Sequence, residues 1–218
     1  VEFDVTLAPW EVPAFRGAVV ARAGRAHDLF HNHAADGRGL YRYPLIQYKR
    51  AGERPVLLCL QAGVDSAHHF FGQPDWSLTL PGRTVPVRIH RLDLRQFNLN
   101  VWDRRFRYRL HRWVALNQEN AARYEQLTGL AERVAFLERT LIGNVLSFAK
   151  GVGWRVPRQI EVRIETLRDP RPTRVKQHQV LAFGVDFTTN VFLPDFVGLG
   201  KHASIGFGVV RALKKMEG

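Results

Sequence analysis

Residues 41–60, YRYPLIQYKRAGERPVLLCL, hold the pattern that decides the fold of the first half of the chain. Two runs rich in aliphatic, aromatic and β-branched residues, 41–49 and 55–60, flank a short turn at 51–54, which predicts a β-hairpin. Working outward, the neighbouring patterns predict a strand, a helix, a second helix and two strands at 1–7, 14–23, 65–71, 76–80 and 85–94. This order is the split βαβ pattern of a ferredoxin-like domain.

The second half repeats that order imperfectly. Its strongest helix is 130–148, where apolar residues recur at spacings of three and four, namely Leu130, Val134, Leu137, Leu141, Val145 and Phe148. The other predicted elements are a strand, a helix and three strands at 106–114, 117–126, 160–167, 174–187 and 205–213. A glycine-rich segment stands where a second helix would be. We therefore expect an α+β fold of two tandem ferredoxin-like (RRM-like) domains, 1–97 and 98–218, the second degenerate.

The net charge of the chain indicates what kind of partner it binds. Lys and Arg number 32 against 20 Asp and Glu, a formal net charge of +12. Such a field favours a polyanion, and nucleic acid more than an acidic membrane surface. No apolar run approaches the roughly 18 residues of a membrane helix, so we expect no membrane partner. The lone Cys59 allows no disulfide within the chain, which fits a cytoplasmic location.

The densest group of candidate catalytic residues lies at the start of the hairpin. His31 and His33 follow the first helix, and Tyr41, Tyr43 and Lys49 lie on the next predicted strand. Histidine titrates near neutral pH and suits both proton transfers of RNA cleavage by its own 2′-hydroxyl. Tyrosine and lysine can donate to the phosphate. A loop with incidental histidines is the alternative.

A metal site is a further alternative for the same histidines. His31 and His33 would need a third ligand, and Asp28, Asp36, His68 and His69 are available. The sequence has no cysteine cluster, no His-Glu-x-x-His motif and no Asp-rich loop. We therefore expect neither a metal nor another cofactor.

Two further segments suit RNA binding. In the alternating strand RRFRYRLHR, 104–112, one face carries Arg105, Arg107, Arg109 and a histidine, which would form a cationic phosphate track. A merely solvated strand face is the alternative. The segment GLGKHASIGFG, 198–208, brings four glycines whose backbone amides could approach a phosphate, and the candidates there are Gly198, Gly200, Lys201, Gly206 and Gly208.

Taken together, these motifs resemble a known family. The Phe-His-Asn-His segment, the Tyr-Pro-Leu-Ile-Gln-Tyr-Lys strand and the Gly-x-Gly-x₅-Gly-Phe-Gly loop are similar to those of CRISPR-associated endoribonucleases of the RAMP superfamily, which process precursor CRISPR RNA. The resemblance covers most of the chain. The glycine loop is its most general mark, and the histidine segment with the tyrosine strand is its more specific one.

The resemblance implies a substrate and a product. The substrate would be CRISPR repeat RNA, cleaved without metal to a 2′,3′-cyclic phosphate and a 5′-hydroxyl. A histidine near the first helix would be catalytic, and we favour His33 as general base or acid with His31 as its partner. Other Cas proteins of an effector complex and a second copy of the chain are further candidate partners. The rival function is a non-catalytic RNA-binding subunit of a CRISPR surveillance complex.

Overall fold

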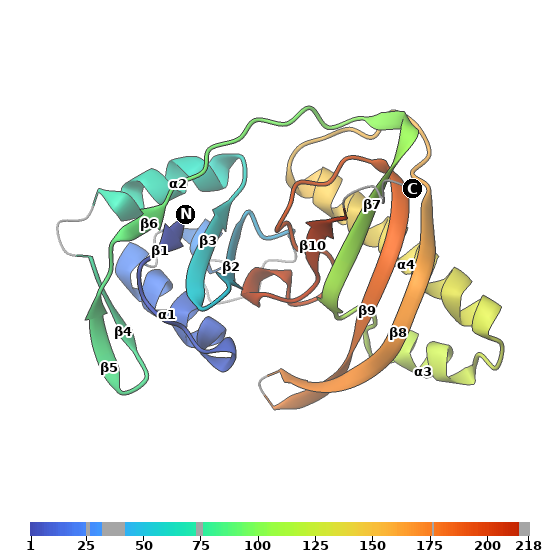
Figure 1. Cartoon of the computed structure of the whole chain (residues 1–218), viewed down its shortest axis with the longest axis horizontal. Helices are drawn as coiled ribbons and strands as arrows, with labels where there is room; N and C mark the ends of the chain where they lie inside the picture. The colour runs from blue at the N-terminus through green and yellow to red at the C-terminus, as the bar shows by residue number, and fades with distance from the viewer. Residues whose placement is uncertain (25–26, 32–41, 73–75, 176, 214–218) are drawn as a thin grey trace. The chain divides into compact units, whose positions relative to one another are not determined.

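The computed structural model describes residues 1–24, 27–31, 42–72, 76–175 and 177–213. The chain forms two compact units. Unit 1 comprises Val1–Gln96 with Ser204–Gly206, and unit 2 comprises Phe97–Ala203 with Phe207–Gly218. Each unit is an antiparallel sheet combined with helices (Figure 1).

Unit 1 has the strand order of a ferredoxin-like domain. Its elements are β1 (Glu2–Phe3), η1 (Pro9–Glu11), α1 (Val12–Ala23), η2 (Asp28–Phe30), β2 (Ile46–Ala51), β3 (Arg54–Cys59), α2 (Ala62–Phe71), β4 (Ser77–Leu80), β5 (Arg83–Pro86) and β6 (Ile89–Arg91). The sheet order is β2-β3-β1-β6, with antiparallel neighbours throughout. The region expected as one strand over 85–94 is divided, because β5 forms a separate hairpin with β4 and β6 completes the main sheet.

The two helices of unit 1 pack against one face of its sheet. Phe15 and Val19 on α1 join Phe70 on α2 in one cluster with the apolar side chains of the sheet, so both helices cover the same face. α1 ends at Gly24, whose φ of 85° is a conformation that residues with a side chain rarely adopt. The tightly packed face of the sheet is therefore the face that the helices cover.

Unit 2 repeats the topology without the second helix. Its elements are β7 (Val101–Trp113), α3 (Gln118–Gln126), α4 (Leu130–Gly151), β8 (Val162–Val175), β9 (His178–Val191) and β10 (Val209–Ala212). The 3₁₀ turn η3 (Ala203–Ile205) precedes β10 in the chain, and its last two residues belong to unit 1. The sheet order β10-β7-β9-β8 matches that of unit 1, element for element. This confirms the predicted α+β fold of tandem ferredoxin-like domains, with a glycine-rich loop in place of the missing helix.

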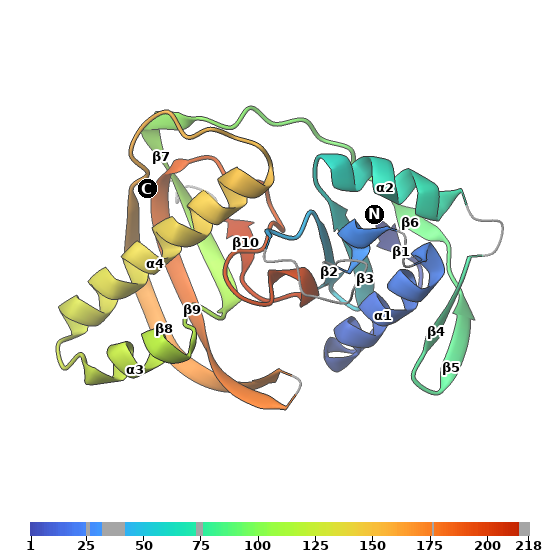
Figure 2. The same cartoon turned by 180° about the vertical axis from the view of Figure 1, so that it is seen from behind.

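One helix covers one face of this sheet, as Figure 2 shows for α4. Leu137, Leu141, Val145 and Phe148 are buried, as their spacing predicts. Leu130 belongs to the same predicted stripe but is 70% exposed, because it is the first residue of the helix. Tyr108 and Leu110 of β7 are buried, so the residues that alternate with them lie on the opposite, open face.

The break expected between the predicted strands 160–167 and 174–187 is wrong. β8 continues through Asp169 and Pro170 to Val175, and β9 begins at His178. Proline removes a ladder donor and usually breaks a strand, but β8 is the edge strand, where one side of the ladder is unpaired. The register shifts between Arg168 and Arg171, which is the β-bulge that accommodates the proline.

Candidate functional site

The segment that carries His31 begins with a single 3₁₀ turn anchored in the core of unit 1. Phe30 ends η2, is 1% exposed, and lies with its ring centroid 6.1 Å from that of Phe70. The His31 amide donates to the carbonyl of Asp28 at 3.2 Å. Asp28 also pairs with Arg42 at 2.9 Å, so an ion pair joins the two described ends that flank residues 32–41.

Two side chains from different elements hold the backbone next to His31. The Tyr48 hydroxyl on β2 donates to the carbonyl of Phe30 at 3.0 Å. The Arg16 Nη2 on α1 donates to the carbonyl of His31 at 2.7 Å. The His31 backbone is therefore tied to α1, to β2 and to its own 3₁₀ turn.

The other catalytic candidates differ in whether the structure describes them and in how deeply they are buried. His33 and Tyr41 lie outside the described residues. Tyr43 is 8% exposed, and its hydroxyl accepts from Gln47 Nε2 at 2.9 Å. Lys49 is 1% exposed. Within the described ranges, no group of three histidine, cysteine or acidic side chains is arranged to hold a metal ion.

Strand alternation separates two of the residues near this site. Tyr48 and Lys49 are neighbours on β2, so their side chains leave the strand on opposite faces. Tyr48 lies on the face packed against the helices and contacts the backbone beside His31. Lys49 therefore belongs to the other face of the sheet.

The arginines of the predicted phosphate track lie on the open face of unit 2, as their alternation predicts. Each of them, however, forms an ion pair with a carboxylate. Arg105 bonds to Glu161, and Arg107 Nε bonds to Glu165 at 2.5 Å. Sequence inspection missed these acidic partners because they lie 56 and 58 positions along the chain.

Asp186 is the buried carboxylate of an ion-pair cluster with two arginines on this face. The aspartate is 5% exposed and accepts two hydrogen bonds from Arg109, at 2.7 and 2.8 Å, and two from Arg168, at 3.1 and 2.8 Å. The hydrogen bonds from Arg109 hold the pKa of Asp186 well below its usual range, and Arg168 adds to this against the opposing effect of burial. Burial lowers the pKa of nearby His111, and the cation of Arg109 acts in the same direction.

The glycine loop is tied to the end of β7 by its backbone. The amide of Lys201 donates to Val114 at 3.0 Å, and that of Gly208 donates to Arg112 at 3.1 Å. Gly198 forms a β-bridge with Val209. The loop therefore completes the sheet of unit 2, a structural role that its glycine spacing alone does not reveal.

The glycines of this loop differ in how tightly they are packed. A Cβ on Gly200 would lie 2.7 Å from the Nε1 of Trp113, and one on Gly208 would lie 1.8 Å from the carbonyl oxygen of Leu199. At Gly206 the nearest heavy atom would be 3.7 Å away, although φ is +84°. Gly200 and Gly208 are thus required by close packing, whereas Gly206 is required only by its backbone conformation.

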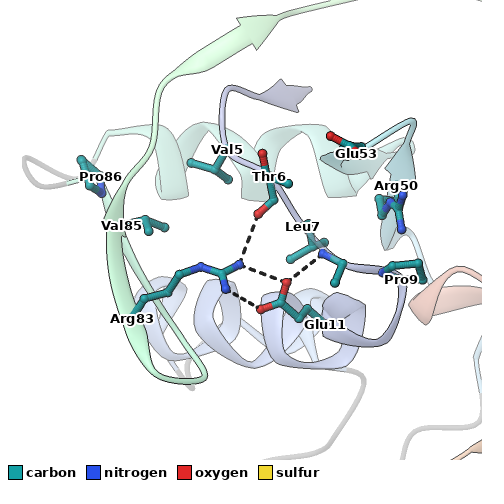
Figure 3. A pocket seen from close by; sticks show the side chains of 11 residues that line it. Val5, Thr6, Leu7, Pro9, Glu11, Arg50, Glu53, Arg83, Val85 and Pro86 are labelled. Atoms are coloured by element: carbon teal, nitrogen blue, oxygen red, sulfur yellow. Dashed lines mark hydrogen bonds and ion pairs between the residues drawn. The ribbon is translucent and has the colours of Figure 1, made fainter.

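A cavity of about 680 Å³ in unit 1 is lined by none of the predicted site residues (Figure 3). Its polar centre is Glu11, which accepts from the Ala8 amide at 2.7 Å and from two nitrogens of Arg83 at 2.9 and 3.0 Å. The hydrogen bond from Ala8, followed by that from Arg83, lowers the pKa of Glu11. This carboxylate therefore serves to join β5 to the start of α1.

Comparisons with known proteins cover nearly the whole chain. Residues 1–98 match the family model of the Cas6b N-terminal domain, and residues 100–213 match that of the Cas6b C-terminal domain. An uncharacterized protein of Methanocaldococcus jannaschii is 30% identical over 98 residues, which span 45% of this chain and 65% of that protein, just under two thirds of its length.

Solved structures share the fold. A crystal structure of Cas6b matches with a TM-score of 0.82 and 26% identity, covering 97% of this chain and 99% of that chain. A crystal structure of a CRISPR RNA processing endoribonuclease Cas6b matches with a TM-score of 0.66 and 22% identity, covering 97% of this chain and 98% of that chain. Csf5, a type IV Cas6 crRNA endonuclease, matches with a TM-score of 0.61 and 14% identity, covering 98% of each chain. Of the helices that the structure describes, none has the length and apolar character needed to cross a membrane.

Proposed function

The chain belongs to the Cas6b family, and from that premise we propose that it is an endoribonuclease that binds CRISPR repeat RNA and cleaves it to mature CRISPR RNA. The observation that carries the proposal is the match of both halves of the chain to the two Cas6b domain models. The relative whose name states CRISPR RNA processing shares the fold over 97% of this chain. A formal charge of +12 suits a polyanionic substrate.

The proposed chemistry uses the 2′-hydroxyl of the RNA as the nucleophile. A histidine removes its proton, the 2′-oxygen bonds to phosphorus, and the bond from phosphorus to the 5′-oxygen breaks. A second group protonates that leaving oxygen, so the products carry a 2′,3′-cyclic phosphate and a 5′-hydroxyl. We assign the two proton transfers to His33 and His31 and the stabilisation of the phosphate to Tyr41, Tyr43 and Lys49. In this scheme neither a metal nor another cofactor takes part.

The anchored backbone of His31 supports its part in this scheme, because a proton-transfer group must be held in place to act. Tyr43 is held by Gln47, so its hydroxyl has a fixed position from which to donate. Lys49 is nearly fully buried, and a role for it at the phosphate requires that the RNA reach the sheet face on which it lies.

We divide the roles between the two proposed domains. The first, 1–97, carries the chemistry, and the second, 98–218, binds RNA through Arg105, Arg107, Arg109 and the glycine loop, with Gly198, Gly200, Lys201, Gly206 and Gly208. The ion pairs of Arg105 and Arg107 do not remove this role, because a phosphate can compete for a guanidinium whose carboxylate partner is accessible to solvent. Other Cas proteins, a second copy of the chain and a cytoplasmic location remain predictions.

The test is single-turnover cleavage of labelled repeat RNA. We expect cleavage that persists in excess chelator and stops when the scissile nucleotide is 2′-deoxy, while binding is retained. His31→Ala should slow cleavage by roughly 10²–10⁴-fold, the usual effect of one proton-transfer group. The matched control is His90→Ala, since His90 is an exposed histidine on β6 of the same unit.

Three results would contradict parts of the proposal. Tight binding without cleavage by the wild-type protein would favour the non-catalytic subunit. Loss of cleavage in chelator would favour a metal site. Equal rates for His31→Ala and His90→Ala would remove His31 from the chemistry.

A further inference from the structure

Both peptide planes that flank the Cα of His31 are tied by hydrogen bonds. The plane before it contains the Phe30 carbonyl, which accepts from Tyr48, and the His31 amide, which donates to Asp28. The plane after it contains the His31 carbonyl, which accepts from Arg16. Because peptide groups are planar and rigid, holding both planes fixes the direction in which the Cβ of His31 leaves the backbone.

We infer that Arg16 and Tyr48 are positioning residues for the catalytic His31, acting on its backbone from α1 and β2. This inference rests on the proposed function, because it assigns His31 a part in the chemistry. Neither residue needs to touch the RNA. Their contribution is to keep the imidazole within reach of the proton that it transfers, where small displacements reduce rates strongly.

The surroundings of Tyr48 suit such a role. Its side chain is 0% exposed, and its ring stands edge-on to Phe15 with centroids 5.8 Å apart. Burial raises the pKa of the Tyr48 phenol, with the charge of Arg16 opposing that effect. The phenol therefore stays protonated and donates to the Phe30 carbonyl throughout the pH range in which a histidine titrates.

A direct contact between Arg16 and RNA is the competing explanation, because arginine commonly binds phosphates. The two explanations differ in what the loss of the side chain changes. A phosphate ligand contributes to affinity, so its loss raises Kd. A positioning residue contributes through His31, so its loss slows the single-turnover rate at saturating protein and leaves Kd unchanged.

The experiment compares Tyr48→Phe, Arg16→Met and Arg16→Lys with the wild-type protein on repeat RNA. The matched control is Tyr108→Phe in unit 2, which also loses a buried phenol hydrogen bond, that from the Leu193 amide at 2.8 Å. We expect Arg16→Met to slow cleavage by about 10–100-fold, Tyr48→Phe to slow it less, Arg16→Lys to recover part of the rate, and the control to match the wild type. Kd should stay the same throughout.

A double variant separates positioning from a general structural effect. In the His31→Ala background, adding Arg16→Met should slow cleavage no further, because the group on which Arg16 acts is already absent. If the two effects multiply, Arg16 acts independently of His31 and the inference is wrong.

Two other outcomes would also overturn the inference. Wild-type rates in both Arg16→Met and Tyr48→Phe would show that the hydrogen bonds do not matter for the chemistry, and a raised Kd with an unchanged rate would make Arg16 an RNA ligand. A wild-type protein that does not cleave repeat RNA would refute the proposed function itself, and the inference would fall with it.

Discussion

Two single variants, Gly200→Ala and Gly206→Ala, should distinguish the two ways in which a side chain destabilises the glycine loop, namely backbone strain and steric overlap. Both residues have φ near +85°, so either alanine suffers the same strain of a left-handed backbone. Of the two, only at Gly200 would the new methyl group clash with other atoms, 2.7 Å from the Nε1 of Trp113 and 2.9 Å from the carbonyl oxygen of Val114. Gly206→Ala is therefore the matched control for Gly200→Ala.

The surroundings of Gly200 cannot easily yield. Trp113 is 0% exposed, and its Nε1 donates to Asn144 Oδ1 at 2.8 Å, so moving the ring would break a partly buried hydrogen bond. The carbonyl oxygen of Val114 accepts a hydrogen bond from the Lys201 amide at 3.0 Å, so moving that carbonyl would break a bond that holds the loop to the end of β7. The steric clash must therefore be absorbed as strain.

The expected magnitudes follow from these contacts. The backbone strain costs about 1–2 kcal/mol in either variant, and overpacking at a rigid site adds about 1–3 kcal/mol for Gly200→Ala alone. The restriction of the unfolded chain by alanine stabilises both variants equally and cancels from their difference. The free energy of unfolding should thus fall by about 1–3 kcal/mol more for Gly200→Ala than for Gly206→Ala.

The assay is equilibrium unfolding in urea, followed by tryptophan fluorescence, with the two variants and the wild type measured side by side. Equal destabilisation of the two variants, within about 0.5 kcal/mol, would refute the steric argument and leave backbone strain as the whole effect.

Three further predictions concern RNA binding and acid stability. Gly206→Ala should stay folded and raise the Kd for repeat RNA more than it slows cleavage of bound RNA, and an unchanged Kd by filter binding would exclude this part of the loop from the interface. Simultaneous replacement of Arg105, Arg107 and Arg109 by alanine should weaken RNA binding. It should also reduce the slope of log affinity against log salt concentration by up to about 2, at about 0.7 per lost contact with single-stranded RNA. Identical slopes would mean that these arginines stay paired with their carboxylates and do not contact the RNA. Because the pKa of Asp186 is lowered by folding, its stabilising effect is present above its unfolded pKa of about 3.9 and is lost as the pH falls through the lower folded value. Asp186→Asn should therefore be less stable than the wild type at neutral pH, and the difference between the two should shrink in acid unfolding experiments; a constant difference would contradict the ion-pair argument.

The sequence was sufficient for features that local patterns encode. The apolar spacing of 130–148 predicts α4, and the alternation of 104–112 correctly assigns Arg107 and Tyr108 to opposite faces of β7. These predictions succeed because helix and strand periodicities depend on residues close together in the chain.

Features set by distant partners could not be predicted in this way. The carboxylate that holds Arg109 lies 77 positions away, and nothing near the arginine reveals it. The continuation of β8 through Pro170 depends on the place of that strand at the edge of the sheet, which local propensity does not contain. The contacts of Arg16 and Tyr48 with the His31 segment likewise join three separate elements.

The pairing of β7 with β10 has a consequence for synthesis on the ribosome. Tyr108 pairs with Ala212, so β7 has emerged and can pair with β9 well before the strand on its other side exists. During that interval the stretch Tyr108–His111 of β7, which β10 later covers, is an unprotected edge to which a strand from another nascent chain could add. The arginines along it keep like chains apart at that stage, since charged side chains on an edge oppose such pairing. These arginines would thus limit aggregation before the protein has met any RNA.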